Sequence, residues 1–470
     1  MAQPQPRTSR RCPVKETPTD REDKARLRHV ALSSFLGTTV EHYDFLLYST
    51  AAALVFNEVF FTNLTPLIGT IVSLATLAAG YLARVVGAIL FGHYGDRLGR
   101  KNVMLTTMIV MGVSSGLIGC LPTYDTVGAV AALPLVFLRL VQGLAVGGEF
   151  GGAVLMTAEH ARTGRRGLMS SAASMGQPSG SVLASGSMAL VTLLPEDRLL
   201  SWGWRIPFLA SFLLLAVGLY FRLRVTESPV FLEQRAKPRN STPPILSLLR
   251  RYPGRVGRAV GFQIGAFCGQ GVFGVFVVSY APTIGYERST ALLALLLGAL
   301  GSALMTPVYA AWSDRVGRKP FAIAGSLGTA VSAYPGFLLI NHGSPPVFVL
   351  TVACFLTFVM TCMGAVAPAM LSELFPTEVR YTAVSTSYQL AATVGAGFGP
   401  LIAASLLAAR GGDTNTGLVS LFLVIVGVFG AVCAWTVQET HRYELTDDDS
   451  VENRVPAVTS VSVQASEPSA

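Results

Sequence analysis

Long apolar stretches separated by short polar segments run through most of this 470-residue chain. Each of these stretches is long enough to cross the roughly 30 Å of hydrocarbon in a bilayer as an α-helix. We place twelve of them, at residues 30–55, 66–91, 103–121, 127–150, 169–194, 204–222, 258–281, 289–311, 320–340, 346–370, 381–409 and 417–438. The pattern therefore predicts an all-α membrane protein with twelve transmembrane helices.

Composition and the placement of charge agree with this interpretation. Charged residues make up 13% of the chain, about half the fraction that soluble proteins usually carry. Of the 35 Lys and Arg residues, 29 lie in the two ends of the chain and in the loops on the side of the N-terminus, and four lie in the opposite loops. This asymmetry predicts a multi-pass protein of the cytoplasmic (inner) membrane with both termini in the cytoplasm, and it explains the net charge of +8 without a nucleic-acid partner. The six cysteines form no metal-ligand or disulfide pattern, so we expect no metal site.

A short charged motif occurs twice, 218 positions apart. Residues 95–102, GDRLGRKN, follow the second apolar stretch, and residues 313–320, SDRVGRKP, follow the eighth, with five of eight positions identical. The matching places of the two copies predict two similar six-helix bundles. The expected domains are a disordered cytoplasmic tail at 1–29, a first bundle at 30–222, a cytoplasmic linker at 223–257, a second bundle at 258–440 and a disordered cytoplasmic tail at 441–470.

Both copies of this motif suggest a gate on the cytoplasmic side. Glycines allow a turn that is too tight for a side chain, and Asp96 can cap the next helix or pair with an arginine. We expect Glu373 to serve the second-half gate with Arg315 or Arg318. The expected gating residues are Gly92, Gly95, Asp96, Arg97, Gly99, Arg100, Lys101, Glu149, Asp314, Arg315, Gly317, Arg318, Lys319 and Glu373.

The first copy, with residues 92–94 before it, resembles the second-to-third-helix signature of the major facilitator superfamily. Five further segments resemble signatures of its metabolite:proton symporter branch: 37–48 (GTTVEHYDFLLY), 139–149 (RLVQGLAVGGE), 202–207 (WGWRIP), 227–229 (ESP) and 373–380 (ELFPTEVR). The resemblance covers about residues 30–440. It implies two six-helix bundles and proton symport of solutes such as α-ketoglutarate and other dicarboxylates, citrate, shikimate, proline or glycine betaine. His42 departs from the branch, which usually has Trp there, and this leaves substrate and pH behaviour open.

Ionisable side chains inside apolar spans are costly and usually line a watery cavity. Glu41 and Asp44 share one face of the first span with Tyr48. Arg84 and Arg139 lie within the second and fourth spans. Our hypothesis is that Asp44 or Glu41 accepts the coupled proton, while Arg84 or Arg139 holds a substrate carboxylate through two hydrogen bonds.

Structural roles stay open for the same side chains. Arg139 and Glu149 could pair only to hold helices together, and Asp96 could form a gate with Glu149 and Arg100. We interpret His42 as a packing residue. The remaining polar residues of the spans, which we expect either to contact the solute or to join helices, are Tyr48, Gln142, Gln263, Gln270, Tyr388 and Gln389.

Together these features predict a proton-coupled secondary active transporter, a symporter that imports a small organic carboxylate or a zwitterionic osmolyte by alternating access. We expect a monomer in the lipid bilayer, driven by the proton gradient without a cofactor. The chain contains no Walker-type nucleotide motif, HExxH sequence or catalytic-triad pattern, so we do not expect an enzyme. The alternatives are a proton-antiport exporter of drugs or metabolites and a solute sensor without flux.

Overall fold

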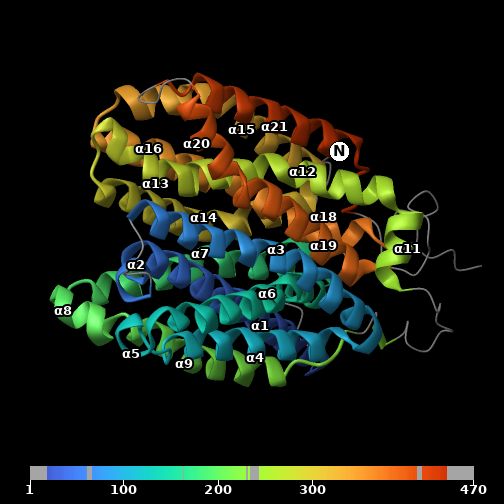
Figure 1. Ribbon diagram of the computed structural model, residues 1–470. Coiled ribbons are helices and arrows are strands. Elements are labelled where there is room, and N and C mark those ends of the chain that lie inside the picture. Colours follow the sequence, from blue (N-terminus) through green and yellow to red (C-terminus); the bar gives the residue numbers. More distant parts are fainter. Residues whose placement is uncertain are drawn as a thin grey trace, which may run out of the picture.

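The computed structural model describes residues 18–60, 66–161, 164–228, 231–232, 243–409 and 415–441. Within these ranges the chain is helical and contains no strand. The helices form two groups that lie side by side, and the first half of the chain lies below the second half in Figure 1. Most of each expected terminal tail, at 1–17 and 442–470, falls outside the described residues.

The first group is built from long helices joined by short turns. Its elements are α1 (Pro18–Leu54), α2 (Phe56–Val59), α3 (Pro66–Leu98), α4 (Arg100–Ile118), α5 (Tyr124–Val127), η1 (Gly128–Ala131), α6 (Ala132–His160), α7 (Arg166–Val191), α8 (Glu196–Arg198), η2 (Leu199–Gly203) and α9 (Arg205–Leu223). Prolines and glycines mark several of the element starts because they interrupt or begin helices readily.

The second group repeats this arrangement with more interruptions within the helices. Its elements are α12 (Pro253–Gly271), η3 (Val272–Phe276), α13 (Val277–Tyr280), η4 (Ala281–Ile284), α14 (Arg288–Val316), α15 (Lys319–His342), α16 (Pro345–Cys354), η5 (Phe355–Met360), α17 (Thr361–Gly364), α18 (Ala367–Leu374), α19 (Arg380–Ala392), η6 (Thr393–Gly397), α20 (Gly399–Ala408) and α21 (Gly417–Thr436). Three of the interruptions, η3, η5 and η6, are π-helical turns, which occur often where a helix carries function.

The helical segments reproduce the predicted spans. In the described part of the chain, nine segments are long and apolar enough to cross a membrane. The helices α1, α3 and α7, with 37, 33 and 26 residues, occupy the three remaining predicted spans. The helix α1 begins at Pro18, inside the segment predicted to be a disordered tail. That prediction is wrong for residues 18–29, because a polar sequence can continue a helix beyond the apolar layer.

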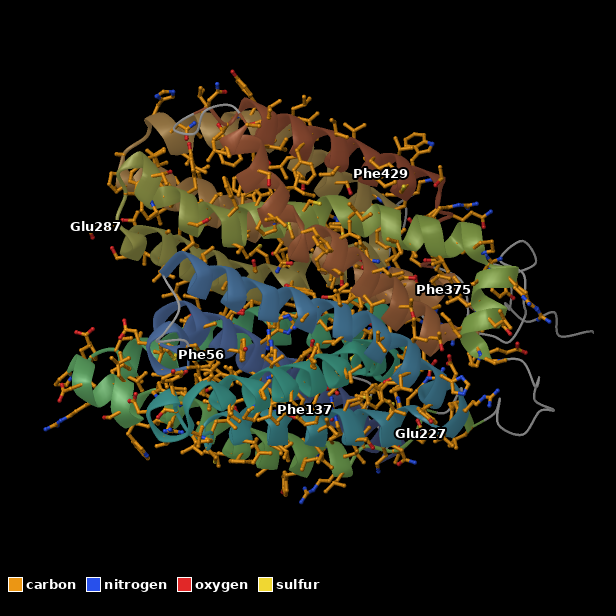
Figure 2. All side chains as sticks on the ribbon, in the orientation of Figure 1. Phe56, Phe137, Glu227, Glu287, Phe375 and Phe429 are labelled. Carbon is orange, nitrogen blue, oxygen red and sulfur yellow. The ribbon has the colours of Figure 1, made fainter. Side chains whose placement is uncertain are left out.

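Apolar side chains cover the outer surface of both groups. Phe137 and Phe429 point outward and are 64% and 49% exposed, as expected for residues that contact lipid (Figure 2). At one end of the first group, Phe56 packs edge-to-face against Phe60 and Trp204, which fixes α2 against the start of α9. Glu227 lies at the opposite end of the molecule (Figure 2).

The predicted linker contains a short helix, α11 (Pro244–Arg251), at the end of the molecule that carries the two charged motifs (Figure 1). It buries Leu248 and contacts α3, α12 and α19, and therefore touches both groups. We call this end of the molecule the basic side, because the loops at Arg97 and Arg315 lie there, and we call the other end the far side.

Candidate functional site

Two arginines meet in the interior of the first bundle. Arg84 of α3 and Arg139 of α6 flank the ring of Phe45, with guanidinium carbons 4.2 and 5.1 Å from its centroid. Tyr81 lies 4.8 Å from Arg84, and Tyr48 lies 4.1 Å from Arg139. These cation–π contacts hold both guanidinium groups in place. Among the described residues, neither arginine forms an ion pair.

Glycines bring these two arginines together. A Cβ atom on Gly143 of α6 would lie 2.6 Å from the carbonyl oxygen of Gly80 on α3. A Cβ atom on Gly147 would lie 2.5 Å from the backbone nitrogen of Ala88. Side chains at either position would force α3 and α6 apart and separate the two guanidinium groups.

Asp44 of α1 faces a chain of neutral polar groups. The Ser211 hydroxyl donates a hydrogen bond to Asp44 Oδ1 at 2.6 Å, whereas Oδ2 is buried with no hydrogen-bond partner among the described residues. Ser115, which also interacts with the Asp44 carboxylate, accepts a hydrogen bond from Gln142 Nε2 at 2.7 Å. Gln142 Oε1 in turn accepts one from Arg139 Nη1 at 2.5 Å. Neutral groups thus link Asp44 to Arg139, and the carboxyl group can change its proton without breaking a direct ion pair.

Glu41 is the second buried carboxyl group of α1. It is 2% exposed, and no hydrogen-bond partner of its Oε2 lies in the part of the chain that the structure describes. It interacts electrostatically with Arg84 and with a second pair of charges, Glu149 and Arg222. The structure thus brings Glu41, Asp44 and the two arginines into one interior region of the first bundle.

The second bundle adds neutral polar groups to this region. Gln177 Nε2 of α7 donates a hydrogen bond to the Tyr388 hydroxyl at 2.6 Å, and the Tyr388 ring stacks on Phe150 at 3.7 Å. Gln389 Nε2 donates to the Val146 carbonyl at 3.5 Å. Both contacts join the bundles. Gln177 was not among the residues predicted to contact the solute, although an amide within an apolar span itself indicates a polar contact.

Two glutamines of α12 that were predicted to contact the solute, Gln263 and Gln270, differ in their exposure. Gln263 is buried, and its Nε2 donates a hydrogen bond to the Ala259 carbonyl of its own helix at 2.6 Å. Its Oε1 has no hydrogen-bond partner among the described residues. Gln270, seven residues later, is exposed. His42 packs against α7, where a Cβ atom on Gly180 would lie 2.9 Å from the His42 Cβ.

On the basic side, aspartates from the two motifs join the bundles. Asp96, near the end of α3, accepts hydrogen bonds from the Thr382 backbone N–H and hydroxyl at 3.0 and 2.8 Å. Asp314, near the end of α14, accepts them from the backbone N–H groups of Gly167 and Leu168 at 2.9 and 3.0 Å. Each aspartate caps a helix of the other bundle, α19 or α7, where the helix dipole favours a negative charge. These contacts hold the two bundles together on the basic side.

Asp96 does not cap the next helix of its own bundle, as we had considered, because another carboxylate occupies that position. Glu227 accepts hydrogen bonds from the backbone N–H groups of Arg100 and Lys101 at the start of α4, both at 3.2 Å. Glu439 does the same at the start of α15, with Arg318 N–H at 2.9 Å. The two motifs are thus held in equivalent ways in both halves.

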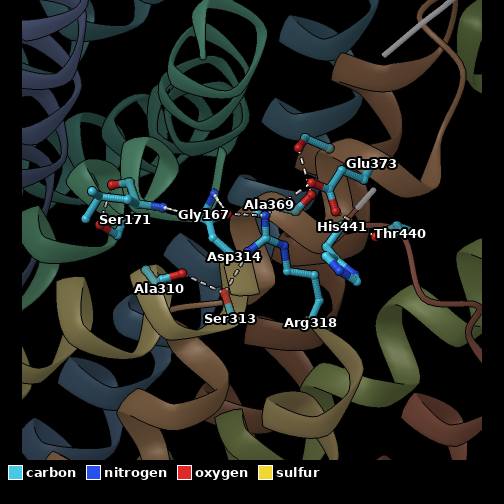
Figure 3. A network of polar contacts seen from close by, with 12 residues as sticks. Gly167, Ser171, Ala310, Ser313, Asp314, Arg318, Ala369, Glu373, Thr440 and His441 are labelled. Carbon is cyan, nitrogen blue, oxygen red and sulfur yellow. Dashed lines mark hydrogen bonds and ion pairs between the residues drawn. The ribbon is translucent and has the colours of Figure 1, made fainter. Parts of the chain in front are cut away.

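Buried ion pairs surround each motif. In the first half, Arg100 Nη2 lies 2.9 Å from Glu159 Oε1, and Arg380 of the second bundle binds the same oxygen at 3.2 Å. In the second half, Arg318 Nη2 lies 2.6 Å from Asp314 and 3.5 Å from Glu373 (Figure 3). These pairs connect three or more helices on the basic side.

Glu149 does not belong to this group, and the expected gate of Asp96, Glu149 and Arg100 is wrong. Its partner is Arg222, at 2.5 Å, and it does not pair with Arg139 either. The reason is helical geometry: Glu149 lies ten residues from Glu159 on α6, about 15 Å along the axis, and cannot reach the loops.

The glycines of the first motif have different roles. Gly92 and Gly95 lie within α3, so they do not form the turn that we expected. A Cβ atom on Gly92 would lie 2.8 Å from Thr382 Cα, so this glycine permits the close approach of α19. The turn is made by Gly99, with φ of 116°, and by Gly317 in the second motif, with the same φ.

The remaining basic residues of the motifs lie toward the periphery. Lys101 Nζ donates to the Leu223 carbonyl at 3.1 Å, and Lys319 Nζ lies 5.4 Å from the Trp435 ring. Arg97 is half-buried and Arg315 is exposed. Of the two arginines considered for Glu373, Arg318 makes the contact.

Known proteins resemble the chain over nearly its whole length. Residues 30–247 match the family described as sugar (and other) transporter, and residues 259–463 match the major facilitator superfamily. The chain is 36% identical over 426 residues to the shikimate transporter of Escherichia coli (strain K12), covering 89% of this chain and 96% of that protein. It is 31% identical over 430 residues to the proline/betaine transporter of the same strain, covering 89% and 85%.

A solved structure shows the same fold. The proton:xylose symporter XylE matches with a TM-score of 0.73 at 20% identity, over 89% of this chain and 97% of that chain. These similarities confirm the predicted architecture of two six-helix bundles and the expectation of a transporter in place of an enzyme. The chain is therefore a multi-pass membrane transporter of the major facilitator superfamily, and it belongs to the branch that contains the shikimate and proline/betaine transporters.

Proposed function

We propose that this protein is a proton-coupled symporter that imports a small organic carboxylate or a zwitterionic osmolyte. The observation that carries the proposal is the pair of guanidinium groups, Arg84 and Arg139, held by aromatic rings beside the carboxyl groups of Asp44 and Glu41. A carboxylate ligand can accept paired hydrogen bonds from either arginine. The relatives support this class, because shikimate, proline and betaine each carry a carboxylate.

Coupling follows from the opposite charges in one enclosed region. When a substrate carboxylate binds the arginines, it reduces the positive potential that favours an ionised Asp44, so this side chain then binds a proton more readily. Substrate and proton therefore favour each other's binding, as a symporter requires. We assign Asp44 as the main proton acceptor, because its links to Arg139 are neutral.

Transport requires that the contacts on the basic side break while a closed state forms on the far side. Asp96 and Asp314 release α19 and α7 in this step, and the bundles rock about the region of Arg84 and Arg139. The proton gradient is the only energy source in this proposal, and the monomer is the transporting unit.

The test uses purified protein in liposomes that contain a pH-sensitive dye. Dicarboxylates, citrate, shikimate, proline and betaine are added outside in turn, and the lumenal pH and solute uptake are measured. Symport predicts lumenal acidification together with uptake, whereas solute–proton antiport predicts lumenal alkalinisation. In Asp44→Asn, exchange of internal for external solute should persist while accumulation driven by a pH gradient is lost. Full accumulation in this variant would remove Asp44 as the acceptor.

A further inference from the structure

A buried ion pair lies in the first bundle, apart from the contacts that join the bundles. Arg222 Nη2 of α9 lies 2.5 Å from Glu149 Oε1 of α6, and both side chains are at most 2% exposed. The Thr107 hydroxyl donates to Glu149 Oε2 at 2.8 Å, and Arg222 Nη1 donates to the Met104 carbonyl at 3.0 Å. Because desolvation offsets most of the attraction within such a pair, stability alone is a weak reason for its presence.

The helix α1 passes directly over this pair. A Cβ atom on Gly37 would lie 2.8 Å from Glu149 Oε1 and 2.9 Å from Arg222 Cζ, so only glycine leaves room for the pair. Glu41 lies one helical turn further along the same face of α1. No described residue forms a hydrogen bond with its buried Oε2.

Glu41 therefore lies between two groups of charges. The charged and titratable groups that face it are Arg84 of α3, Glu149 of α6, Arg222 of α9 and Tyr388 of α19. Arg84 belongs to the proposed substrate site. Glu149 and Arg222 lie on the opposite side of Glu41, toward the basic side.

A small cavity continues this polar chain beyond Arg222. It has a volume of about 10 Å³, and its lining includes Ser33, Ser34, Lys101 and Arg222. This volume is close to the minimum that holds one water molecule, and the lining offers several polar partners for it. Lys101 marks the surface of the basic side, so the cavity lies between the ion pair and that surface.

We propose that Glu149 and Arg222 form a proton relay behind Glu41, through which the proton that enters with the substrate leaves toward the basic side. The proton that Asp44 has accepted passes first to the Glu41 carboxylate, three residues earlier on the same face of α1, so that the O–H bond on Asp44 breaks as one forms on Glu41. The O–H bond of protonated Glu41 breaks, and a new O–H bond forms on the Glu149 carboxylate. A water molecule that moves in from the cavity beside Arg222 then takes this proton from Glu149, which restores its negative charge. One proton moves, and no other bond changes.

Arg222 acts as the positioning residue of this relay. While Glu149 is ionised, Arg222 pairs with it, and Glu41 keeps its proton. When Glu149 becomes protonated, the guanidinium group can turn toward the newly ionised Glu41, because both carboxyl groups lie beside it. The buried positive charge thus has a negative partner at each stage, which avoids the cost of an unpaired charge.

The relay rests on the proposed symport, and the following experiment distinguishes failure of the relay from failure of symport. Glu149→Gln keeps the shape of the side chain but cannot release a proton. With shikimate as the probe in liposomes, this variant should exchange internal for external solute within about twofold of the wild-type rate, while accumulation driven by a pH gradient falls at least tenfold. The exposed Asp125→Asn serves as a control and should keep both activities. Undiminished accumulation in Glu149→Gln overturns the relay, and so does loss of exchange together with accumulation, since that indicates a structural role.

A second measurement needs no transported solute. Infrared difference spectra of the purified protein should contain a carboxylic-acid C=O band that Glu41→Gln removes. In Glu149→Gln this band should weaken, because Arg222 then turns to Glu41 and favours its ionised form. An unchanged band contradicts the relay even if shikimate is not a substrate. Failure of the wild type to move any solute of the screen with protons contradicts the proposed symport instead.

Discussion

Removing the Asp96 carboxylate should open the basic side of the transporter. Asp96 accepts three hydrogen bonds from the other bundle: from the Tyr381 and Thr382 N–H groups at 3.0 Å each, and from the Thr382 hydroxyl at 2.8 Å. These bonds exist only while the bundles are closed, because opening returns the carboxylate and its donors to water. Asp96→Ala therefore destabilises the closed state selectively.

The magnitude follows from the net value of such bonds. Each contributes about 1 kcal/mol after exchange with water, so the three together contribute about 3 kcal/mol. That energy corresponds to a change of roughly a hundredfold in the equilibrium between closed and open states. The Asp314 cap on α7 remains in place in both variant and wild type, so it does not alter this ratio.

Labelling of a buried cysteine on the closed interface measures this equilibrium. Ser385 of α19 is 1% exposed and lies against the first bundle, where a Cβ atom on Gly151 would be 3.1 Å from its Cβ. In a background without the six natural cysteines, a maleimide applied from the basic side should modify Ser385→Cys ten to a hundred times faster when Asp96→Ala is present. Glu227→Ala is the matched control, because Glu227 caps α4 within a single bundle. Equal labelling with and without Asp96→Ala, or an equal increase with Glu227→Ala, refutes the reasoning.

Three further outcomes follow from the structure. Arg84→Gln should raise the half-saturating concentration of a carboxylate substrate by about ten- to a hundredfold in uptake assays, because a charged hydrogen bond of about 1.5–3 kcal/mol is lost. An unchanged half-saturating concentration excludes the anion-binding role of Arg84. Burial alone raises the pKa of Glu439, but backbone N–H groups that include that of Arg318 hold its pKa below the ordinary value. The stabilisation from these backbone groups is therefore complete above about pH 5 and is lost as the pH falls through the lowered folded-state pKa. The melting-temperature difference between wild type and Glu439→Gln should therefore shrink as the pH falls from about 5 to below about 4. Gly317→Ala should cost at least about 1–2 kcal/mol of stability in thermal unfolding, because φ there is 116° and a Cβ would lie 2.8 Å from Glu439 Cδ, whereas Gly186→Ala has open space and should be neutral.

The sequence predicted which residues face the interior better than it predicted their partners. Apolar length placed the spans, and helical spacing placed Glu41 and Asp44 on the face of α1 that meets the arginines. The same spacing could not show that Asp96 caps α19, because 286 positions separate it from Thr382 and the contact depends on how the two bundles dock. Periodicity identifies a buried face, but it does not identify the helix packed against that face.

The partners of Glu149 illustrate the same limit within one bundle. The sequence suggested a gate because Glu149 is a charged residue in a glycine-rich span. The rise of an α-helix already sets the distance between Glu149 and the loops at the end of α6. What the pattern lacked was the pairing with Arg222, a positive charge at the end of the sixth predicted span. Arg222 is buried, as its 1% exposure shows, and it donates to the Met104 carbonyl inside the bundle. A count of positive charges by loop cannot distinguish such a residue from a solvated one.

The two halves repeat each other on the basic side but differ in the middle of the membrane, and this difference assigns the chemistry to one bundle. Caps by Asp96 and Asp314 are equivalent, as are those by Glu227 and Glu439. Among the described residues from 259 to 436, however, every Asp, Glu, Lys and Arg lies in a loop or near a helix end. Within the ranges that the structure describes, the buried charges in the middle of the membrane therefore come from the first bundle, where we propose that they bind an anion and a proton. Because the second bundle presents neutral groups such as Tyr388, its movement can change which side has access to the site while leaving the charges that bind substrate and proton where they are.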